Sequence, residues 1–575
     1  MADNLLCSWD SVHDPVHAAY TTTNAAEISP GLTRPLPADI WRACDYLWDR
    51  GLVEDLGTQD LVAIPEPPTA TTMPFIAGRL VINYGINVAF AGTFAVEEGS
   101  DTFKQLVGGG EAVRTGASEN QSRNVATRRR MMDRWQQAEV VGNKHRETST
   151  RAYLESRLRD WKAPSDGELV EALDEAIALL GRIFLGHYYA TLGGAEFTTA
   201  IENLLKEHLP DHPPGWTNTV TSGLTGVESA EPAKAIWDLS RFILARPPLA
   251  GEFASLSADD FAARLEAPPG EDWQAFAGEY AAFIDSCGFR GQNEIDPSHR
   301  TWDEAPHFVL SIIQANLNAG PDRDPHERER NQAAAREAVE REIESRLPAE
   351  ALDEYRQALE LGQMLNRARE MTKANWVRAT RSQRPPVVEL GRRLAERGLL
   401  DDAEDVWFLR LSELPQAAEG TLDAGEAKAN VAARKAEMAS LEGHELPVMF
   451  DWPVELIPKE TAEAVTSATY DGLGISPGAV TGRARVVTSA AAAISAELEP
   501  GEILVAPVTD AGWTPLFIPA AGVVVETGGI LSHAATVARE FGIPAVAGVR
   551  KATELIPDGA TVTIDGSTGT VTVEP

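Results

Sequence analysis

Cysteine is scarce in this sequence of 575 residues, which contains only Cys7, Cys44 and Cys287. The three are widely spaced, with no C-x-x-C pair and no metal-finger pattern. The sequence therefore predicts neither disulfides nor a zinc site, and no metal ligand or tightly bound cofactor is expected in this chain. The N-terminus is polar and lacks the charged-then-apolar pattern of a signal segment. These absences predict a protein of the reducing cytoplasm.

Positive charge is also in short supply, because 86 acidic residues stand against 51 lysines and arginines, a formal net charge of −35. Such a chain repels phosphate backbones and anionic lipids, so neither nucleic acid nor membrane is expected as a partner. No uninterrupted apolar run approaches the length of a bilayer span. What remains is a globular composition in a chain long enough for roughly two to four domains.

The most informative stretch is TGGILSHAATVAREFGIPAV at residues 527–546. The apolar run at 522–525 predicts a buried strand, a glycine pair then permits a tight turn, and Ser532 is suited to cap a helix that His533 enters. A neutral imidazole is nucleophilic, so it can accept a phosphoryl group that would face the positive end of the helix. A single histidine is nevertheless more often structural than catalytic, and the residues alone leave both interpretations open.

This stretch resembles the phosphohistidine signature of the phosphoenolpyruvate (PEP)-utilising enzymes, in which a threonine, a glycine pair, Ser-His, Ala-Arg-Glu and Gly-Ile-Pro-Ala-Val recur. The resemblance implies that His533 is the catalytic phosphoryl carrier. It also implies a loop that supports the phosphohistidine, formed by Thr527, Gly528, Gly529 and Ser532. Thr514, in the segment TDAGWTPL, is expected nearby as a hydrogen-bond donor, with a purely structural turn as the alternative.

A pair of cations marks the helical part of the chain. Arg369 and Lys373 stand four residues apart on one face of a long helix predicted between about 351 and 381. Two cations side by side repel unless an anion lies between them, although two solvated side chains remain the alternative. The segment REMTK resembles an element of the substrate domain of rifampicin phosphotransferase and its relatives. That resemblance implies that both cations stabilise the phosphoryl group during transfer.

Two further segments resemble the same substrate domain. One is an N-terminal loop in which an asparagine is followed three residues later by Glu27, and then by Pro-Gly and Thr-x-Pro-Leu. The other is CGFRGQNEID at 287–296. From the chemistry of its residues alone, the segment 287–296 could equally form a charged pocket or a salt-bridged turn. The resemblance favours a role on the acceptor side. The residues expected to bind substrate or hold its pocket are Arg290, Glu294, Asp296, Glu27 and His187, the last with aromatic packing as the alternative.

The resemblance covers nearly the whole chain and implies a multidomain architecture. A large, mainly α-helical substrate domain with some β structure is expected over 1–450. A linker rich in proline and small polar residues is expected over 451–472, and a small α/β phosphohistidine domain over 473–575. In the family this domain swivels between two sites, and the linker is long enough to allow such travel.

The sequence also lacks a P-loop, any segment matching an ATP-grasp domain, and the pyruvate-handling barrel that follows the phosphohistidine domain in phosphoenolpyruvate synthase. By resemblance to phenylphosphate synthase-like phenol kinases, we expect a dikinase subunit that turns ATP into AMP and phosphate. ATP and Mg²⁺ would be bound by a separate ATP-grasp subunit. The acceptor would be the hydroxyl of a small, phenolic compound. The alternatives are an antibiotic O-phosphotransferase and a non-enzymatic phosphocarrier or regulatory protein.

Overall fold

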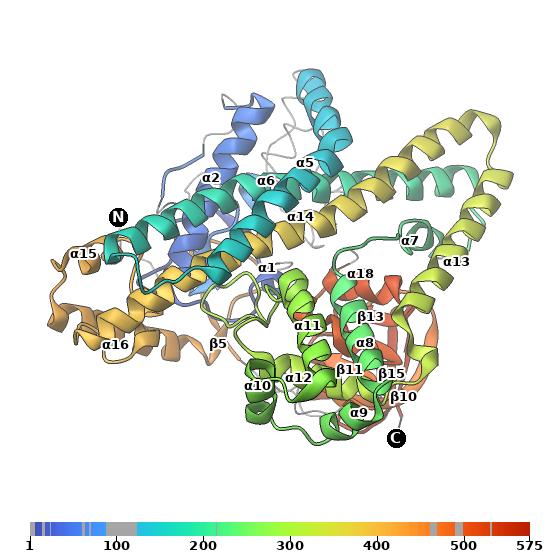
Figure 1. Ribbon diagram of the computed structural model, residues 1–575. Helices are drawn as coiled ribbons and strands as arrows, with labels where there is room; N and C mark the ends of the chain where they lie inside the picture. Colours follow the sequence, from blue (N-terminus) through green and yellow to red (C-terminus); the bar gives the residue numbers. More distant parts are fainter. Residues whose placement is uncertain are drawn as a thin grey trace. The chain divides into compact units, whose positions relative to one another are not determined.

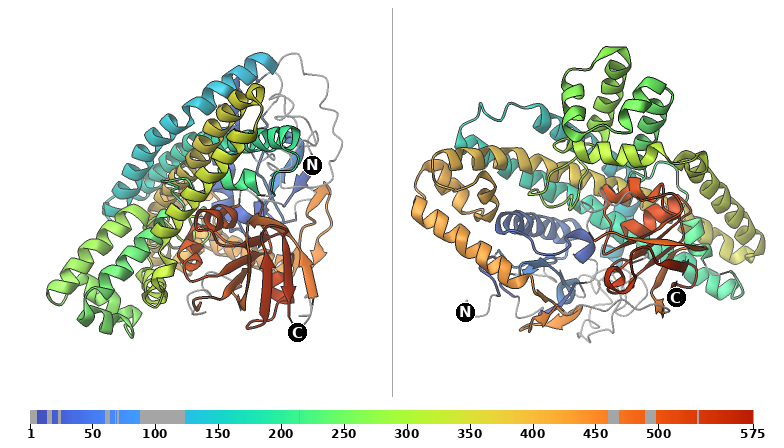
Figure 2. Two further views of the ribbon diagram at one scale, coloured as in Figure 1. Left: turned by 90° about the vertical axis from the view of Figure 1, so that its right-hand side faces the viewer. Right: turned by 90° about the horizontal axis from the view of Figure 1, so that it is seen from below.

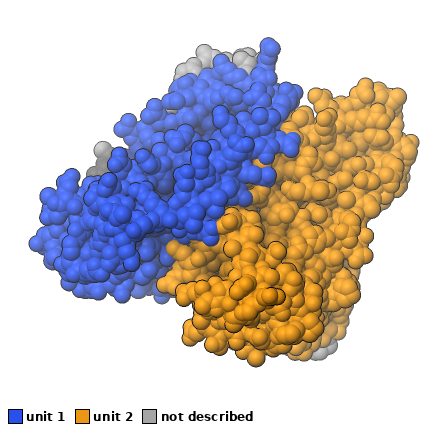
Figure 3. Space-filling view, in the orientation of Figure 1, with its two compact units in different colours: residues 1–193, 295–299, 372–460 blue, residues 194–294, 300–371, 461–575 orange. Residues whose placement is uncertain are grey.

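The computed structural model describes residues 6–13, 18–22, 25–59, 64–67, 69, 71–87, 124–213, 215–459, 468–488, 498–529 and 532–574. The chain forms two compact units that are interleaved along the sequence (Figure 3). Unit 1 comprises Met1–Gly193, Ile295–His299 and Thr372–Glu460, and unit 2 comprises Gly194–Glu294, Arg300–Met371 and Thr461–Pro575. The units do not follow the predicted boundaries, because residues 194–294 and 300–371 of the predicted substrate domain pack with the C-terminal α/β part.

Unit 1 is mainly helical (Figure 1). Helix α6 (Asp166–His208) starts with a capping box formed by Ser165 and Glu168: Glu168 N donates to Ser165 Oγ at 3.3 Å and Ser165 N to Glu168 Oε2 at 2.7 Å. The helices are α1 (Ala25–Ile28), α2 (Pro35–Leu56), α5 (Asn124–Leu158), the first part of α6 (Asp166–His208), the last part of α14 (Ala349–Glu396), η3 (Ala403–Phe408), α15 (Glu413–Glu419) and α16 (Ala424–Leu441).

Short strands complete unit 1. A three-stranded antiparallel sheet has the order β4-β1-β6, and two further pairs are formed by β2 with β3 and by β5 with β7. The strands are β1 (Ala19–Thr21), β2 (Phe75–Ile76), β3 (Arg79–Leu80), β4 (Ile82–Asn83), β5 (His444–Glu445), β6 (Met449–Asp451) and β7 (Ile457–Pro458).

Unit 2 combines helices with a large sheet. Its helices are the last part of α6, α7 (Trp216–Val220), α8 (Glu231–Leu244), α9 (Pro247–Phe253), α10 (Ala258–Glu266), α11 (Gly270–Cys287), α12 (Pro306–Leu317), η2 (Pro321–Arg323), α13 (Pro325–Arg346), the first part of α14, η4 (Ala511–Phe517), α18 (His533–Glu540) and α19 (Ala552–Leu555). None of the described helices of the chain combines the length and apolar composition needed to cross a bilayer.

The sheet of unit 2 has eight strands in the order β8-β15-β14-β10-β11-β12-β13-β9. The C-terminal part of the chain that forms it is coloured orange to red in Figure 2. The inner pairs β10-β11, β11-β12 and β12-β13 are parallel, and the others are antiparallel. The strands are β8 (Ala468–Asp471), β9 (Leu473–Ser476), β10 (Ala479–Val486), β11 (Ile503–Ala506), β12 (Gly522–Val525), β13 (Ala545–Ala547), β14 (Thr561–Asp565) and β15 (Thr570–Val573).

The two ends of this strand order are joined by a single residue. Gly472 is all that separates β8, which pairs with β15, from β9, which pairs with β13. The sheet therefore curls until one nearly continuous strand serves both of its ends. A side chain at Gly472 would lie 2.6 Å from the carbonyl oxygen of Ala547, so only glycine fits this joint without rearrangement.

The region 451–472, where a linker is predicted, includes described residues of three strands, β6, β7 and β8, and the boundary between the two units falls within it. Strand β8 belongs to the sheet of unit 2 because Ala468–Asp471 pairs antiparallel with β15 over its full length. Proline and small polar residues favour an irregular segment locally, but pairing with a strand distant in sequence overrides that preference. Residues 460–467 lie outside the described part of the chain.

The sheet is covered on both faces, so successive residues of its central strands enter two different apolar clusters. In β11, Leu504 and Ala506 belong to one cluster, whereas Ile503 and Val505 belong to the other. Because both faces are covered, all four residues of β11 and of β12 are buried. This explains why the parallel strands appear in the sequence as continuous apolar runs.

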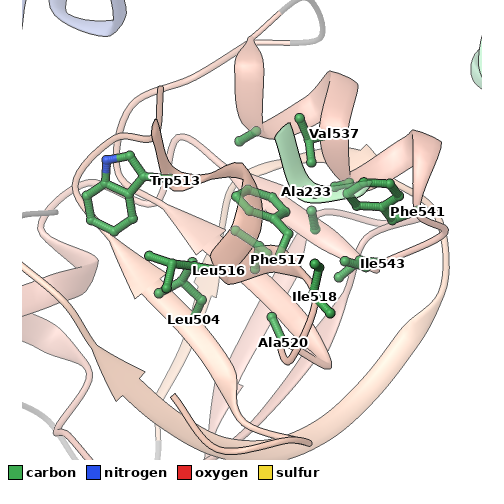
Figure 4. Close-up of a cluster of buried hydrophobic side chains, with 14 of the residues drawn as sticks. Ala233, Leu504, Trp513, Leu516, Phe517, Ile518, Ala520, Val537, Phe541 and Ile543 are labelled. Atoms are coloured by element: carbon green, nitrogen blue, oxygen red, sulfur yellow. The ribbon is translucent and has the colours of Figure 1, made fainter. Parts of the chain in front are cut away.

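The first of these clusters joins helices from different parts of unit 2 (Figure 4). Phe517 of η4 and Phe541, next to the C-terminal end of α18, pack in it together with Ala233 and Trp237 of α8. Helix α8 contacts η4 directly. The C-terminal α/β part is therefore packed against α8 here, while the swivelling expected from the family resemblance remains a prediction.

Candidate active site

The stretch around His533 has the predicted strand–turn–helix structure. Strand β12 lies between β11 and β13, and the chain continues from its C-terminal end towards α18 (Figure 1). Ser532 is the N-cap of α18, because its Oγ accepts a hydrogen bond from Ala535 N at 3.1 Å. His533 is consequently the first residue of the helix, where backbone N–H groups and the helix dipole favour a negative charge.

Backbone hydrogen bonds hold the described residues that precede His533. Thr527 N donates to Pro507 O at 3.0 Å, and Ser532 N donates to Gly529 O at 3.0 Å. A Cβ atom on Gly528 would lie 3.3 Å from Ser532 Oγ, closer than nearly all such contacts. The structure thus brings together the loop residues predicted from the sequence, and their role toward a phosphohistidine stays a prediction.

The side chain of His533 is 5% exposed and is held by η4. Its Nε2 lies 3.0 Å from Thr514 Oγ1, and its ring meets that of Phe517 edge to face, with 6.5 Å between the ring centroids. The structure therefore places Thr514 next to His533, as predicted. Phe517 was missed, although it follows Thr514 by three residues, because the sequence gives no sign of which way its ring points.

Asp510 fixes the N-terminal end of η4 and was also missed. Its Oδ1 accepts a hydrogen bond from Gly512 N at 2.9 Å, and its Oδ2 accepts one from Asn293 N at 2.8 Å. Gly512 lies so close to the segment 288–294 that a Cβ atom there would be 2.6 Å from Gly291 O. An aspartate followed by glycine is a recognisable cap signal, but its second partner is distant in sequence.

Arg290 and Glu294 form a closed ion pair beside this contact. Arg290 Nη1 lies 3.2 Å from both carboxylate oxygens of Glu294, and each side chain is 2% exposed. Burial by itself lowers the pKa of Arg290, but the carboxylates of Glu294 and Glu228 outweigh it and hold this pKa above its ordinary value. This geometry fits residues that hold the segment 288–294 in shape, because the two opposite charges neutralise each other inside the protein.

Arg369 lies on α14 in unit 2 and forms a close ion pair with the neighbouring Glu370. The two side chains are 13% and 3% exposed. The boundary between the units passes through α14 after Met371, so Lys373 belongs to unit 1. Within unit 2, the structure brings Arg369 close to α18, because the guanidinium of Arg369 acts electrostatically on Arg539.

The other predicted substrate residues belong to unit 1. His187 Nδ1 lies 3.3 Å from Thr372 Oγ1, and the imidazole centroid is 5.7 Å from the ring centroids of both Phe184 and Trp376. His187 thus has the aromatic packing that the sequence analysis kept as its alternative. Asp296 is half-buried, and its Oδ1 accepts a hydrogen bond from Ser298 N at 2.8 Å.

Glu27 lies in α1, and its side chain is outside the described part of the structure.

Two known families match this chain in consecutive regions. Residues 188–375 match the family described as "Rifampicin phosphotransferase fourth domain", which spans the region from α6 to α14 and includes Arg290, Glu294 and Arg369. Residues 498–569 match the family described as "PEP-utilising enzyme, mobile domain", which includes β11 to β14, Thr514 and His533.

Similar proteins carry names that indicate different products. Rifampicin phosphotransferase of Streptomyces sviceus is 30% identical over 434 residues, which are 74% of this chain and 49% of that protein. Prodigiosin synthesizing transferase PigC of Serratia marcescens is 30% identical over 362 residues, 63% of this chain and 40% of that protein. Chondramide synthase cmdD of Chondromyces crocatus is 32% identical over 440 residues, 70% of this chain and 11% of that protein. The matched region thus spans half or less of each of these relatives.

Proposed function

Because this chain belongs to the PEP-utilising enzymes, we propose that it is a phosphotransferase in which His533 carries a phosphoryl group to the hydroxyl of a small organic acceptor. The observation that carries the proposal is the position of His533 at the first residue of α18, with Nε2 3.0 Å from Thr514 Oγ1. A nucleophile, a hydroxyl donor and the positive end of a helix converge there.

These groups suit both states of the histidine. The Thr514 hydroxyl can donate to a lone pair of the free imidazole and, after phosphorylation, to a phosphoryl oxygen. In the transfer step the N–P bond breaks as the acceptor oxygen bonds to phosphorus, and the hydroxyl proton is released. Charge then builds on the phosphoryl oxygens, and Arg369 and Lys373 are proposed to stabilise it.

We further propose that the phosphoryl group comes from ATP with Mg²⁺, held by a separate nucleotide-binding subunit, in a reaction that yields AMP and phosphate. The separate donor subunit rests on the sequence resemblance to phenylphosphate synthase-like enzymes. The proposed acceptor is a phenol, which rests on the sequence resemblance to phenol kinases.

A rifamycin-type antibiotic is the alternative acceptor. It is supported by the similarity to a protein named rifampicin phosphotransferase over most of this chain. Phosphorylation of a rifamycin with no turnover of any phenol would favour this alternative. Stable label on a second protein, without a phosphorylated small molecule, would favour a phosphocarrier.

The test combines the chain with a candidate ATP-grasp subunit, radiolabelled ATP, Mg²⁺ and a panel of phenols and rifamycins. Replacing His533 by alanine should reduce product formation by about a thousandfold or more, because the nucleophile is lost. The acid-labile label on the protein should disappear as well. The matched control is His326→Ala, since His326 lies on α13 and pairs with Asp238 at 2.9 Å near the surface. Full phosphorylation of the acceptor by the His533→Ala variant would sink the proposal.

A further inference from the structure

Helix α18 faces a second polar feature, one turn or more beyond His533. A small pocket in unit 2 is lined from α18 by Arg539 and Glu540 and from α14 by Arg369 and Glu370. Its cavity volume is about 20 Å³, which is room for one or two water-sized groups and too little for an aromatic ring. The pocket is separate from the hydrogen bond at His533 Nε2, which is directed to Thr514.

Two guanidinium groups meet at this pocket. Burial lowers the pKa of Arg539 to about 10, and the nearby positive charge of Arg369 adds to this effect. Arg539 therefore remains protonated at neutral pH although a second cation is close. Its Nη1 donates to Ile475 O at 3.3 Å, which fixes the direction of the side chain. Two like charges in one buried pocket repel each other unless an anion shares the space.

The carboxylates of the pocket do not cancel both cations. Burial raises the pKa of Glu540 to about 8, despite the positive charge of Arg539, so Glu540 is largely protonated at neutral pH. Glu540 is 3% exposed, and its Oε2 accepts a hydrogen bond from Leu224 N at 3.0 Å. At neutral pH the lining thus holds the guanidinium groups of Arg369 and Arg539, whereas one of its two carboxyl groups, that of Glu540, is largely neutral.

Helices α18, α14 and α13 supply the charged groups around Glu540. Arg539 lies beside it on α18, and α14 supplies Arg369 and Glu370. From α13, the carboxylate of Glu329 raises the pKa of Glu540 further, although Glu329 is paired with Lys234 of α8 at 3.0 Å. The acidic neighbours on α13 and α14 thus reinforce burial in keeping Glu540 neutral.

Neutral polar side chains complete the lining. Thr536 of α18 and Asn366 of α14 both border the pocket, and each can donate a hydrogen bond to an oxygen atom. Thr536 follows His533 by three residues and so lies on the same side of the helix. The pocket thus combines charged and neutral donors at a scale that suits one or two oxygens of a tetrahedral anion.

We propose that this pocket receives one or two oxygens of a phosphate group between Arg369 and Arg539, either of free inorganic phosphate or of a small organic phosphate monoester whose organic part stays outside the pocket. Charge-assisted hydrogen bonds from guanidinium groups are among the strongest available to a phosphate. The inference rests on the proposed function only for the origin of the ligand, because a dikinase releases phosphate and forms a phosphate monoester. Binding itself requires neither ATP nor an acceptor.

Calorimetric titration of the full chain, without nucleotide, tests the proposal. The probes are sulfate, inorganic phosphate and phenyl phosphate, and the variants are Arg539→Gln and, as a control, Arg485→Gln. Arg485 lies in the same α/β part but is paired with Glu502 at 3.0 Å. At least one probe should bind the unmodified chain and the control variant with equal affinity. The Arg539→Gln substitution should weaken the affinity for that probe about tenfold or more. Whichever of inorganic phosphate and phenyl phosphate binds more tightly identifies the source of the phosphate group.

The proposal is overturned if no probe binds at about 10 mM, or if Arg539→Gln binds as tightly as the control. If Arg539→Gln does not fold, Arg539→Lys keeps one charge but loses the planar fork and should still weaken binding. Phosphotransfer with no anion binding would reject this inference and leave the proposed function standing. Anion binding with no phosphotransfer would support this inference and reject the proposed function.

A pH series gives an independent readout. Sulfate stays fully ionised between about pH 6 and 9, so any change in its affinity comes from the protein. Its affinity should fall as pH rises through about 8, because Glu540 then becomes negative, and Glu540→Gln should remove this fall. Sulfate affinity in the unmodified chain that is flat across this range would contradict the assignment.

Discussion

Unit 2 contains two groups of arginine and glutamate that differ in how they are closed. In the first, Arg290 and Glu294 meet at 3.2 Å, are 2% exposed and neutralise each other's charge. In the second, Arg369, Glu370, Arg539 and Glu540 surround a pocket. The same residue types therefore give a structural brace where the charges pair completely, and a site open to a ligand where they surround a space.

The largest expected effect comes from breaking the closed pair. Replacing Glu294 by alanine leaves the guanidinium of Arg290 buried, which should lower the free energy of unfolding by about 3–5 kcal/mol. Urea denaturation measures the change. The control is Glu344→Ala, which removes an exposed partner of Arg356 at 2.9 Å and should leave stability nearly unchanged. Equal effects of the two variants would mean that the buried pair is not a brace.

A smaller effect is expected at the contact between the braced segment and η4. Alanine at Gly512 would place Cβ 2.6 Å from Gly291 O, and both are backbone-anchored, so the contact must open at a cost of about 1–3 kcal/mol. Thermal unfolding and the fluorescence of Trp513 report on this loop. Gly278→Ala in α11 is the control, because a side chain there meets nothing within 4 Å and should slightly stabilise the helix.

The stability of the open group should depend on pH through Glu540. The pKa of Glu540 is raised by burial from 4.5 to about 8, so the folded state holds a proton that the unfolded state loses. The contribution of Glu540 to stability is thus fully present below pH 4.5. It declines by up to about 1.4 kcal/mol per pH unit as pH rises toward 8.

Comparing the unfolding free energies of the unmodified chain and Glu540→Gln between these pH values isolates this dependence. Glu344→Gln serves as the control, because its pKa is lowered by Arg356. A slope that Glu540→Gln leaves unchanged would show that Glu540 is ionised in the folded protein.

The smallest expected effect concerns the cap of α18, which depends on neither group. Ser532→Ala removes the acceptor for Ala535 N and should cost about 1 kcal/mol. Ser532→Gly should cost only a few tenths of that amount, because glycine is tolerated at this position. Hydrogen exchange at the first turn of α18 would follow the change, and equal protection in both variants would argue against a capping role.

Local patterns made the centre of the site predictable. The strand, the glycine turn and the cap before His533 are contiguous in the sequence, so short-range rules place the histidine at the start of a helix. The structure confirms that placement, and it confirms a mainly helical chain with a C-terminal α/β part. The contact between Thr514 and His533 was anticipated from the family resemblance and is present.

Features that depend on long-range contacts were not predictable. Asp510 reaches Asn293 across 217 residues, and β8 pairs with a strand about a hundred residues later, in a region where local composition indicates a linker. The sequence also gives no sign that Arg539 lies near Arg369, because the two residues lie on different helices that line one pocket. Sequence spacing describes neighbours on one element, whereas these contacts are decided by how elements pack.

The joint at Gly472 protects the sheet in a way that ordinary open sheets lack. A sheet with free ends offers unpaired backbone groups to other chains and invites edge-to-edge aggregation. Here β8 and β9 occupy both ends of the strand order and follow each other in the chain, so a single peptide segment covers the edge of β15 and the edge of β13. An insertion at this one residue would therefore disturb the cover of both edges at once.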